Sequence, residues 1–148
     1  MGTAAVDPIT VEVIRAALNA AAERMRIAMI QTAYNHIISE SLDFGCAIFD
    51  PDVQMIAQGI GLPIFQGHLG FPIQATIRDR GLEAFHEGDI FIHNDPYTGN
   101  GNHLNDVAMY APVGGLPALP ALVPLREDEP VLSVRSDQPV SILPPTAR

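Results

Sequence analysis

The spacing of apolar residues near the start of the chain predicts one long helix. Asp7 followed by Pro8 is typical of a helix start, because Asp caps the free amides of the first turn and Pro fits its first position. Small or apolar residues then recur at helical spacing over residues 9–37. Tyr34 and Asn35 mark the place where this helix could break.

Further along, apolar runs separated by turn residues predict a β-hairpin and a second helix. We expect strands over residues 44–49 and 53–58, joined by an Asp-Pro-Asp turn. Residues 64–70 are expected to be an irregular approach to a helix that runs from residue 72 to Gly81, because Gly is the usual residue just past a helix end.

Two more strand-like runs, residues 89–93 and 107–110, enclose a polar stretch that reads HNDPYTGNGNHLND over residues 93–106. A loop held between two strands is a common place for chemistry, because the scaffold is rigid and the loop side chains are free. The whole pattern predicts an α+β fold with a long N-terminal helix, a β-hairpin and a small mixed sheet.

The character of the sequence changes towards the C-terminus. Residues 114–148 hold seven of the thirteen Pro residues and contain neither an aromatic residue nor a His. Pro117, Pro120 and Pro124 recur too often for a helix or a central strand. We therefore divide the chain into a folded part, residues 1–113, and a Pro-rich irregular tail, residues 114–148.

The composition narrows the function classes. Apolar residues make up 47% of the 148 residues, which is enough for a folded core. The formal net charge of −9 argues against nucleic acid and anionic membranes as partners, because both need clustered Lys and Arg. All eight basic residues are Arg, so a lysine Schiff base, a lysine general base and a Walker-type phosphate loop are excluded. Any ATP chemistry would fall to another polypeptide.

Cys46 is the only cysteine, so no internal disulfide can form. It lies in an apolar run without a flanking basic residue, which favours a buried, inert thiol over a nucleophile. The N-terminus lacks the basic and apolar regions of a secretory signal, and no apolar run is long enough to span a membrane. We expect a cytoplasmic protein.

His103 and Asp106 are the strongest candidates for metal ligands. An imidazole and a carboxylate three residues apart suit a divalent cation, and the neighbouring Gly101 and Asn102 are too polar for a core. The same pair is also common by chance, and two ligands do not complete a site, which needs at least three protein groups.

Four further residues, His68, Asp95, Glu40 and Asp43, are candidates for catalytic roles. His68 lies in a Gly-flanked segment, where the backbone can approach a ligand closely. Asp95 either takes part in chemistry or caps the turn of residues 94–97. Glu40 and Asp43 precede the first hairpin strand, where such a pair serves as an acid–base pair or as a cap.

Several of these segments together resemble the hydantoinase B/oxoprolinase family, which includes N-methylhydantoinase B subunits, 5-oxoprolinase and acetone carboxylase-type subunits. The segments that carry the resemblance, in order, are residues 7–15 (DPITVEVIR), 40–50 (ESLDFGCAIFD), 68–70 (HLG), 94–97 (NDPY) and 103–106 (HLND). No single one is decisive, but their order and spacing over roughly residues 7–113 make the resemblance specific.

The resemblance implies a division of labour. A hydantoinase A-type partner binds ATP and phosphorylates the carbonyl oxygen of the substrate, and the B-type subunit completes the reaction in a hetero-oligomer. The implied reaction is ring-opening hydrolysis of a cyclic amide such as a hydantoin or 5-oxoproline, with carboxylation of a ketone as the alternative. His103 and Asp106 inherit a role in binding a divalent metal, with Mn, Zn or Fe as the candidates.

Family members run to several hundred residues and continue into a segment that supplies a further His ligand. No His follows His103 in this chain. We therefore expect the isolated chain to be an incomplete and non-catalytic fragment. The abrupt change after residue 113 leads to the hypothesis that residues 114–148 are an out-of-frame translation of a longer gene, which translation of the same DNA in the other two frames would test.

Overall fold

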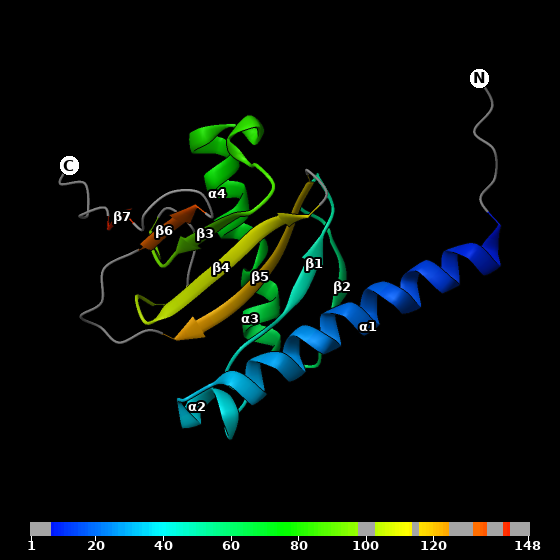
Figure 1. Ribbon diagram of the computed structural model, residues 1–148, viewed down its shortest axis with the longest axis horizontal. Coiled ribbons are helices and arrows are strands. Elements are labelled where there is room, and N and C mark those ends of the chain that lie inside the picture. Colours follow the sequence, from blue (N-terminus) through cyan, green and yellow to red (C-terminus); the bar gives the residue numbers. More distant parts are fainter. Residues whose placement is uncertain (1–6, 98–102, 114–115, 125–131, 136–140, 143–148) are drawn as a thin grey trace.

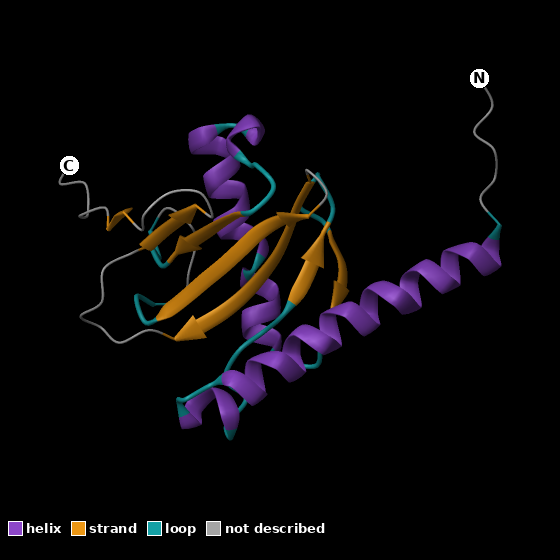
Figure 2. Ribbon diagram, viewed as in Figure 1, coloured by secondary structure: helices purple, strands orange, loops and turns teal. Residues whose placement is uncertain are grey.

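The computed structural model describes residues 7–97, 103–113, 116–124, 132–135 and 141–142, with the backbone alone for the last three ranges. Helices and strands alternate irregularly along the chain and form separate layers (Figures 1 and 2). The elements are α1 (Pro8–Thr32), α2 (His36–Ser39), β1 (Ala47–Phe49), β2 (Met55–Gln58), α3 (Pro63–His68), α4 (Gly70–Arg80), the 3-10 helix η1 (Leu82–Ala84), β3 (Asp89–His93), β4 (Asp106–Val113), β5 (Leu116–Pro124), β6 (Leu132–Arg135) and β7 (Ser141–Ile142).

The long helix α1 begins where the sequence predicts, but it ends at Thr32, just before the predicted break and short of residue 37. The Asp7 side chain accepts a hydrogen bond from the Thr10 amide at 3.2 Å, and Pro8 occupies the first turn. The helix stops at Thr32, and the chain turns before α2, whose first turn is capped by the Asn35 side chain. The predicted break near Asn35 is therefore confirmed, since an Asn that caps a new helix cannot also continue the old one.

The predicted hairpin is confirmed as β1 and β2. In its turn, Asp50 Oδ1 accepts hydrogen bonds from the amides of Asp52 at 3.0 Å and Gln54 at 2.7 Å. Val53 adopts a positive φ of 58° there, which the two Asp50 contacts and its own burial against the core hold in place. The strands pair antiparallel, with an irregularity between Ile48 and Phe49.

The expectation of an irregular approach over residues 64–70 is wrong, because residues 63–68 form α3. Pro63 lies in the first turn of α3, where its missing amide hydrogen has no cost and its fixed φ favours the helix. The predicted stop at Gly81 is confirmed, since Gly81 ends α4 with a φ of +79°.

The strands form two sheets, and every described pairing is antiparallel. One sheet is the β1–β2 hairpin, and the other has five strands in the order β5-β4-β3-β6-β7. The predicted strand over residues 89–93 is confirmed as β3, and the α+β class is confirmed. The sheet is antiparallel where a mixed sheet was expected, because its neighbouring strands β3, β4 and β5 follow one another along the chain.

The Pro-rich segment contains a strand that the sequence did not predict. β5 pairs with β4 along its whole length, from Val113 opposite Leu116 to Asp106 opposite Pro124. Because β5 is the outermost strand of its sheet, one side of its backbone needs no ladder partner, and Pro is tolerated there. This strand qualifies the expectation of an irregular tail.

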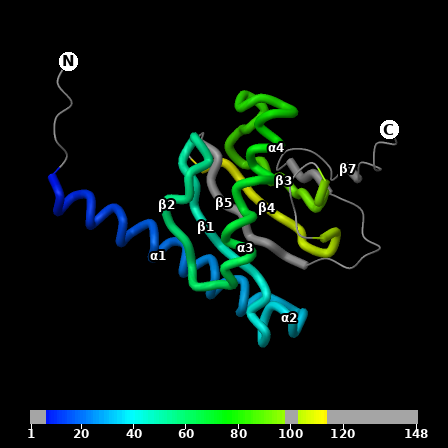
Figure 3. Tube along the Cα trace, turned by 180° about the vertical axis from the view of Figure 1, so that it is seen from behind, coloured from blue at the N-terminus to red at the C-terminus, as the bar shows by residue number. Residues whose placement is uncertain are grey.

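The main core lies between β4 and the helices α3 and α4. These two helices lie behind the strands in Figure 1 and in front of them in Figure 3, so both cover one face of the sheet. Ala108 and Tyr110 lie two residues apart on β4, so both point to this helix layer, where they belong to one core cluster with Ile73 of α4. Phe91 of β3 stacks on Tyr110 with ring centroids 5.4 Å apart. The Tyr110 hydroxyl is tied to Thr76 and to the Pro72 carbonyl of α4.

The helix α1 packs through its second half only. Its methionines Met25 and Met29 pack against a smaller cluster formed by Ile38, Phe44 and Cys46. The first half of α1 extends past the strands in Figure 1, and its apolar side chains are exposed. The stability of the fold should therefore depend on α4 and β4 rather than on the start of α1.

We expect Ile73→Ala to lower the free energy of unfolding by about 3 kcal/mol, because Ile73 is 1% exposed and its loss leaves a cavity. The matched control is Ile9→Ala, which removes the same atoms from a side chain that is 73% exposed and should change stability by less than about 0.5 kcal/mol. Urea unfolding of the two variants measures both values, and equal losses would contradict this placement of the core.

Candidate functional site

The polar stretch between β3 and β4 is a loop whose two ends are held together. The Asn94 side-chain amide donates a hydrogen bond to the Leu104 carbonyl at 3.0 Å. His93 Nε2 lies 3.2 Å from the Asp95 carbonyl oxygen. Sequence reasoning missed the contact made by Asn94, because its partner lies ten positions away and no local pattern reports it.

His103 and Asp106 come together at the end of this loop. His103 Nε2 lies 3.2 Å from Asp106 Oδ1, and the Asp106 amide donates to the His103 carbonyl at 3.1 Å. The His103 side chain is 61% exposed, whereas that of Asp106 is only 8% exposed. The pair therefore joins a group that solvent or a ligand can reach to a carboxylate held inside the protein.

Asp106 is the first residue of β4, and its side chain points to the same face of the strand as those of Ala108 and Tyr110. Because that face packs into the main core, the Asp106 carboxylate is buried. Its second oxygen, Oδ2, is buried and has no hydrogen-bond partner among the residues that the structure describes. A buried carboxylate oxygen without a partner is costly, so this position calls for a hydrogen-bond donor or a cation.

The contacts of the His103 ring indicate its tautomer. The Asn105 amide donates to His103 Nδ1 at 3.3 Å, so Nδ1 is the unprotonated nitrogen of the neutral ring. Nε2 then carries the hydrogen of the neutral ring, and it lies 3.2 Å from Asp106 Oδ1. We call this close pair of side chains the His–Asp dyad.

This donor set supplies two ligands for a divalent metal and not three. Within the described parts of the chain, no group of three or more His, Cys, Asp or Glu side chains is arranged to hold a metal ion. The imidazole of His103 and the unpartnered oxygen of Asp106 are ligand types that Mn, Zn and Fe accept, but Nδ1 would have to release the Asn105 amide before the neutral ring could bind a cation. A complete site needs at least one further ligand.

Among the described residues, the four candidates for catalytic roles do not join His103 and Asp106 in a metal-binding cluster. Asp95 Oδ1 accepts a hydrogen bond from the Tyr97 amide at 2.8 Å, which is the turn-capping geometry considered as the alternative role. Glu40 instead pairs with His36 of α2, with 2.8 Å between Oε1 and Nδ1.

Asp43 and His68 lie on separate elements. Asp43 follows α2, where its amide donates to the Ile37 carbonyl at 3.0 Å and its side chain is half-buried. His68 ends α3 with Nδ1 2.6 Å from the Ile64 carbonyl oxygen, and its ring meets Phe71 edge-on. Nδ1 of His68 is therefore a donor, which leaves Nε2 as the nitrogen that could accept a proton.

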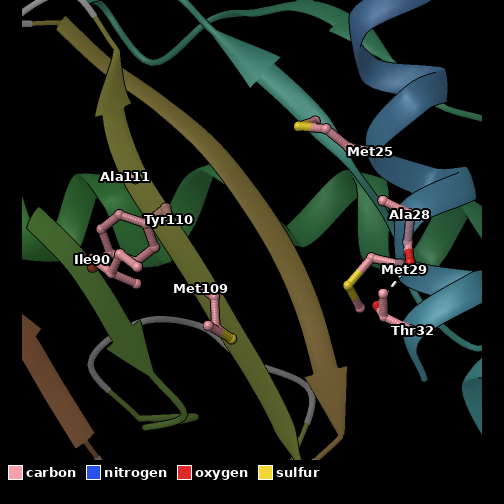
Figure 4. A pocket seen from close by; sticks show the side chains of 8 residues that line it. All are labelled: Met25, Ala28, Met29, Thr32, Ile90, Met109, Tyr110 and Ala111. Atoms are coloured by element: carbon pink, nitrogen blue, oxygen red, sulfur yellow. Dashed lines mark hydrogen bonds between the residues drawn. The ribbon is translucent and has the colours of Figure 1, made fainter. Parts of the chain in front are cut away.

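An apolar groove of about 300 Å³ lies between α1 and the sheet, away from His103 and Asp106 (Figure 4). It has no carboxylate or imidazole among its described lining residues. Its one titratable group, Tyr110, has its pKa raised to about 12 because the ring is buried. The described lining of the groove therefore supplies no group that titrates near neutral pH. Its lining residues are Met25, Ala28, Met29, Thr32, Ile90, Met109, Tyr110 and Ala111.

Cys46 is an inert thiol, as the sequence predicts. It is 1% exposed, and burial raises its pKa to about 11, above the usual range for a thiol. A thiol that stays protonated at neutral pH is a poor nucleophile.

Among the described residues there is no helix long and apolar enough to cross a membrane.

The family of this chain is decided by comparison with known proteins. The profile of the family described as hydantoinase B/oxoprolinase matches residues 7–121. The chain belongs to the hydantoinase B/oxoprolinase family. The match extends eight residues past the boundary predicted at residue 113 and into β5.

Two curated relatives are similar over the same part of the chain. The caprolactamase subunit beta of Pseudomonas jessenii is 36% identical over 108 residues, which are 73% of this chain and 18% of that protein. The 5-oxoprolinase of Dictyostelium discoideum is 32% identical over 111 residues, which are 75% of this chain and 9% of that protein. The chain thus spans less than a fifth of the length of these relatives.

Two solved structures share the fold. The crystal structure of the ATP-dependent caprolactamase from Pseudomonas jessenii has a TM-score of 0.55 at 35% identity, over 80% of this chain and 21% of that chain. The nucleotide-free acetone carboxylase has a TM-score of 0.72 at 20% identity, over 81% of this chain and 16% of that chain. At that identity, the likeness to acetone carboxylase shows the fold alone.

We expect the stability of the protein to fall between about pH 9 and pH 11 through Cys46. Its folded pKa is raised from 9.0 to about 11, so the unfolded chain loses this proton first and alkaline pH favours unfolding. Between pH 8 and pH 10 the free energy of unfolding should fall by about 1 kcal/mol, because the unfolded thiol ionises over this range while the folded thiol stays protonated. Urea unfolding of wild type and Cys46→Ala at both pH values measures it. An equal pH dependence in the two proteins would contradict this account.

Proposed function

We propose that this chain is the N-terminal part of a hydantoinase B-type subunit that opens a cyclic amide, such as a hydantoin or 5-oxoproline, by ATP-dependent hydrolysis. The observation that carries the proposal is the family match over residues 7–121. The names of the two curated relatives support the substrate class, since caprolactam and 5-oxoproline are both cyclic amides.

ATP is handled by a partner in this proposal. The chain contains no Lys, so it cannot form the lysine-bearing phosphate loop that binds ATP in many enzymes. The caprolactamase relative is named as a subunit and its structure as ATP-dependent, which supports a complex in which nucleotide and substrate are divided between chains. We assign the nucleotide to a hydantoinase A-type subunit in a hetero-oligomer.

His103 and Asp106 would hold a divalent metal, with Mn, Zn or Fe as the candidates. Asp106 presents the buried, unpartnered Oδ2, and the exposed His103 presents an imidazole next to it. A bound cation would polarise the carbonyl of the substrate amide. The remaining ligands would come from outside the described residues or from the longer protein that the relatives represent.

The other candidate residues have supporting roles in this proposal. His68 could take or give a proton through Nε2, since its Nδ1 is turned to the Ile64 carbonyl. Glu40 and Asp43 would act as an acid–base pair near the start of the hairpin. Asp95 would act through its carboxylate, which also accepts a hydrogen bond from the Tyr97 amide in the turn.

Ketone carboxylation is the alternative function. It is supported by the shared fold with acetone carboxylase, whereas the two named cyclic-amide enzymes are more similar in sequence. A second alternative is that the 148-residue chain is a non-catalytic fragment, because it spans so little of its relatives and offers two metal ligands.

The decisive experiment transplants residues 7–121 into the corresponding part of the Pseudomonas jessenii caprolactamase subunit beta. The hybrid is assembled with its ATP-binding partner, and ATP-dependent ring opening is measured with caprolactam, hydantoin and 5-oxoproline. We expect measurable ring opening of at least one cyclic amide. In the hybrid, His103→Ala should lower activity by at least about 100-fold, the scale of losing an acid–base or metal-binding group.

The matched control is His86→Ala, which removes an exposed imidazole next to Asp89 and should change activity by less than about threefold. Metal analysis of the same preparations gives a second measurement, since His103→Ala should lose bound metal and His86→Ala should keep it. Loss of all ring opening in a folded hybrid would contradict the proposal. Consumption of ketone and bicarbonate instead would favour carboxylation.

A further inference from the structure

Within the described part of the loop that carries the proposed site, the side chain of Asn94 joins the two ends. Asn94 directly follows β3, whose last residue His93 is paired with Ala108 of β4. Its backbone is therefore held by the sheet, and its half-buried side chain reaches across the loop to the Leu104 carbonyl at 3.0 Å. The hydrogen bond thus connects the rigid end of β3 to the turn before β4.

The acceptor of this bond belongs to the same peptide group that orients His103. The carbonyl of Leu104 and the amide of Asn105 share one planar unit, so fixing the oxygen also fixes the direction of the N–H. That N–H donates to His103 Nδ1 at 3.3 Å. The contacts therefore run from Asn94 through one rigid peptide to the imidazole ring.

The orientation of this peptide decides which nitrogen of His103 carries a hydrogen. While the Asn105 N–H faces Nδ1, the neutral ring must place its hydrogen on Nε2, which lies 3.2 Å from Asp106 Oδ1. If the peptide turned over, Nδ1 would lose its donor and the ring could adopt the other tautomer. The dyad of His103 and Asp106 would then no longer be fixed.

We propose that Asn94 is a positioning residue that sets the tautomer and direction of His103 by holding the peptide between Leu104 and Asn105. The role of this residue in a reaction rests on the proposed function of His103 and Asp106, and the tautomer described here is that of the metal-free pair, because a cation on Nδ1 would displace the Asn105 amide. The positioning itself is a property of the described residues and can be measured without substrate, metal or partner.

The test is NMR of the His103 ring in the full 148-residue chain at about pH 8, where an ordinary imidazole is neutral. The ring nitrogens are labelled with ¹⁵N, and the His103 signals are identified as those that are missing from the spectrum of His103→Gln. We expect a single Nε2–H tautomer in the wild type. Asn94→Asp, which has the same shape but lacks the donor, should give a mixture of tautomers, and the Asn105 amide should exchange with solvent about fivefold to tenfold faster.

Two further variants keep the test decisive. Asn19→Asp makes the same chemical change at an exposed position of α1 and should retain the wild-type ring signals. Asn94→Ser adds no charge and is too short to reach Leu104, so it should repeat the effect of Asn94→Asp even if that variant folds poorly. An unchanged Nε2–H tautomer in a folded Asn94 variant would overturn the proposal. The same holds if the variant is less stable but keeps this tautomer, because Asn94 would then only stabilise the turn.

The same variant separates this inference from the proposed function. In the active caprolactamase hybrid, Asn94→Asp should lower kcat with little change in KM, because the groups that bind substrate remain while the dyad loses its geometry. If the hybrid opens no cyclic amide but the tautomer still shifts in the isolated chain, the proposed function fails and the positioning role of Asn94 stands.

Discussion

The packing of β4 against α4 is the contact on which the rest of the structure depends. Ala108 and Tyr110 point from β4 into the core that contains Ile73, and the Tyr110 hydroxyl is bonded to the α4 backbone at Pro72. β4 also pairs with strands on both sides, β3 and β5. A strand fixed by its neighbours and by a helix layer has little freedom to shift, because a slip of one residue would turn its core side chains to the other face.

This constraint explains how an irregular loop can hold two groups in a defined relation. Asp106 is both the first residue of β4 and the acid of the dyad, so its carboxylate inherits the rigidity of the strand. His103 stays exposed at the end of the loop and is joined to Asp106 by a short turn. The rigid partner sets the geometry, and the exposed partner remains available to a ligand.

Local signals in the sequence were enough for much of the fold and for the pairing of His103 with Asp106. The cap at Asp7, the hairpin turn at Asp50 and the stop at Gly81 each depend on neighbours within a few residues, and all three appear in the structure. The helix α3 was missed because its six residues are too short to show a period. The edge strand β5 was missed because its prolines are tolerated only by virtue of its place in the sheet. The burial of Asp106 and the reach of Asn94 also depend on tertiary contacts that no local pattern contains.

The most direct test of this account is a double-mutant cycle between His103 and Asp106, measured by urea unfolding of the full chain near pH 7. The variants are His103→Gln, Asp106→Asn and the two combined. If the dyad exists in solution, the two changes should be non-additive by about 0.5–1 kcal/mol, because each single change removes the same polar contact and His103 is largely solvent-exposed. Additivity within about 0.3 kcal/mol would contradict the claim that the end of the β3–β4 loop holds these two residues as one unit.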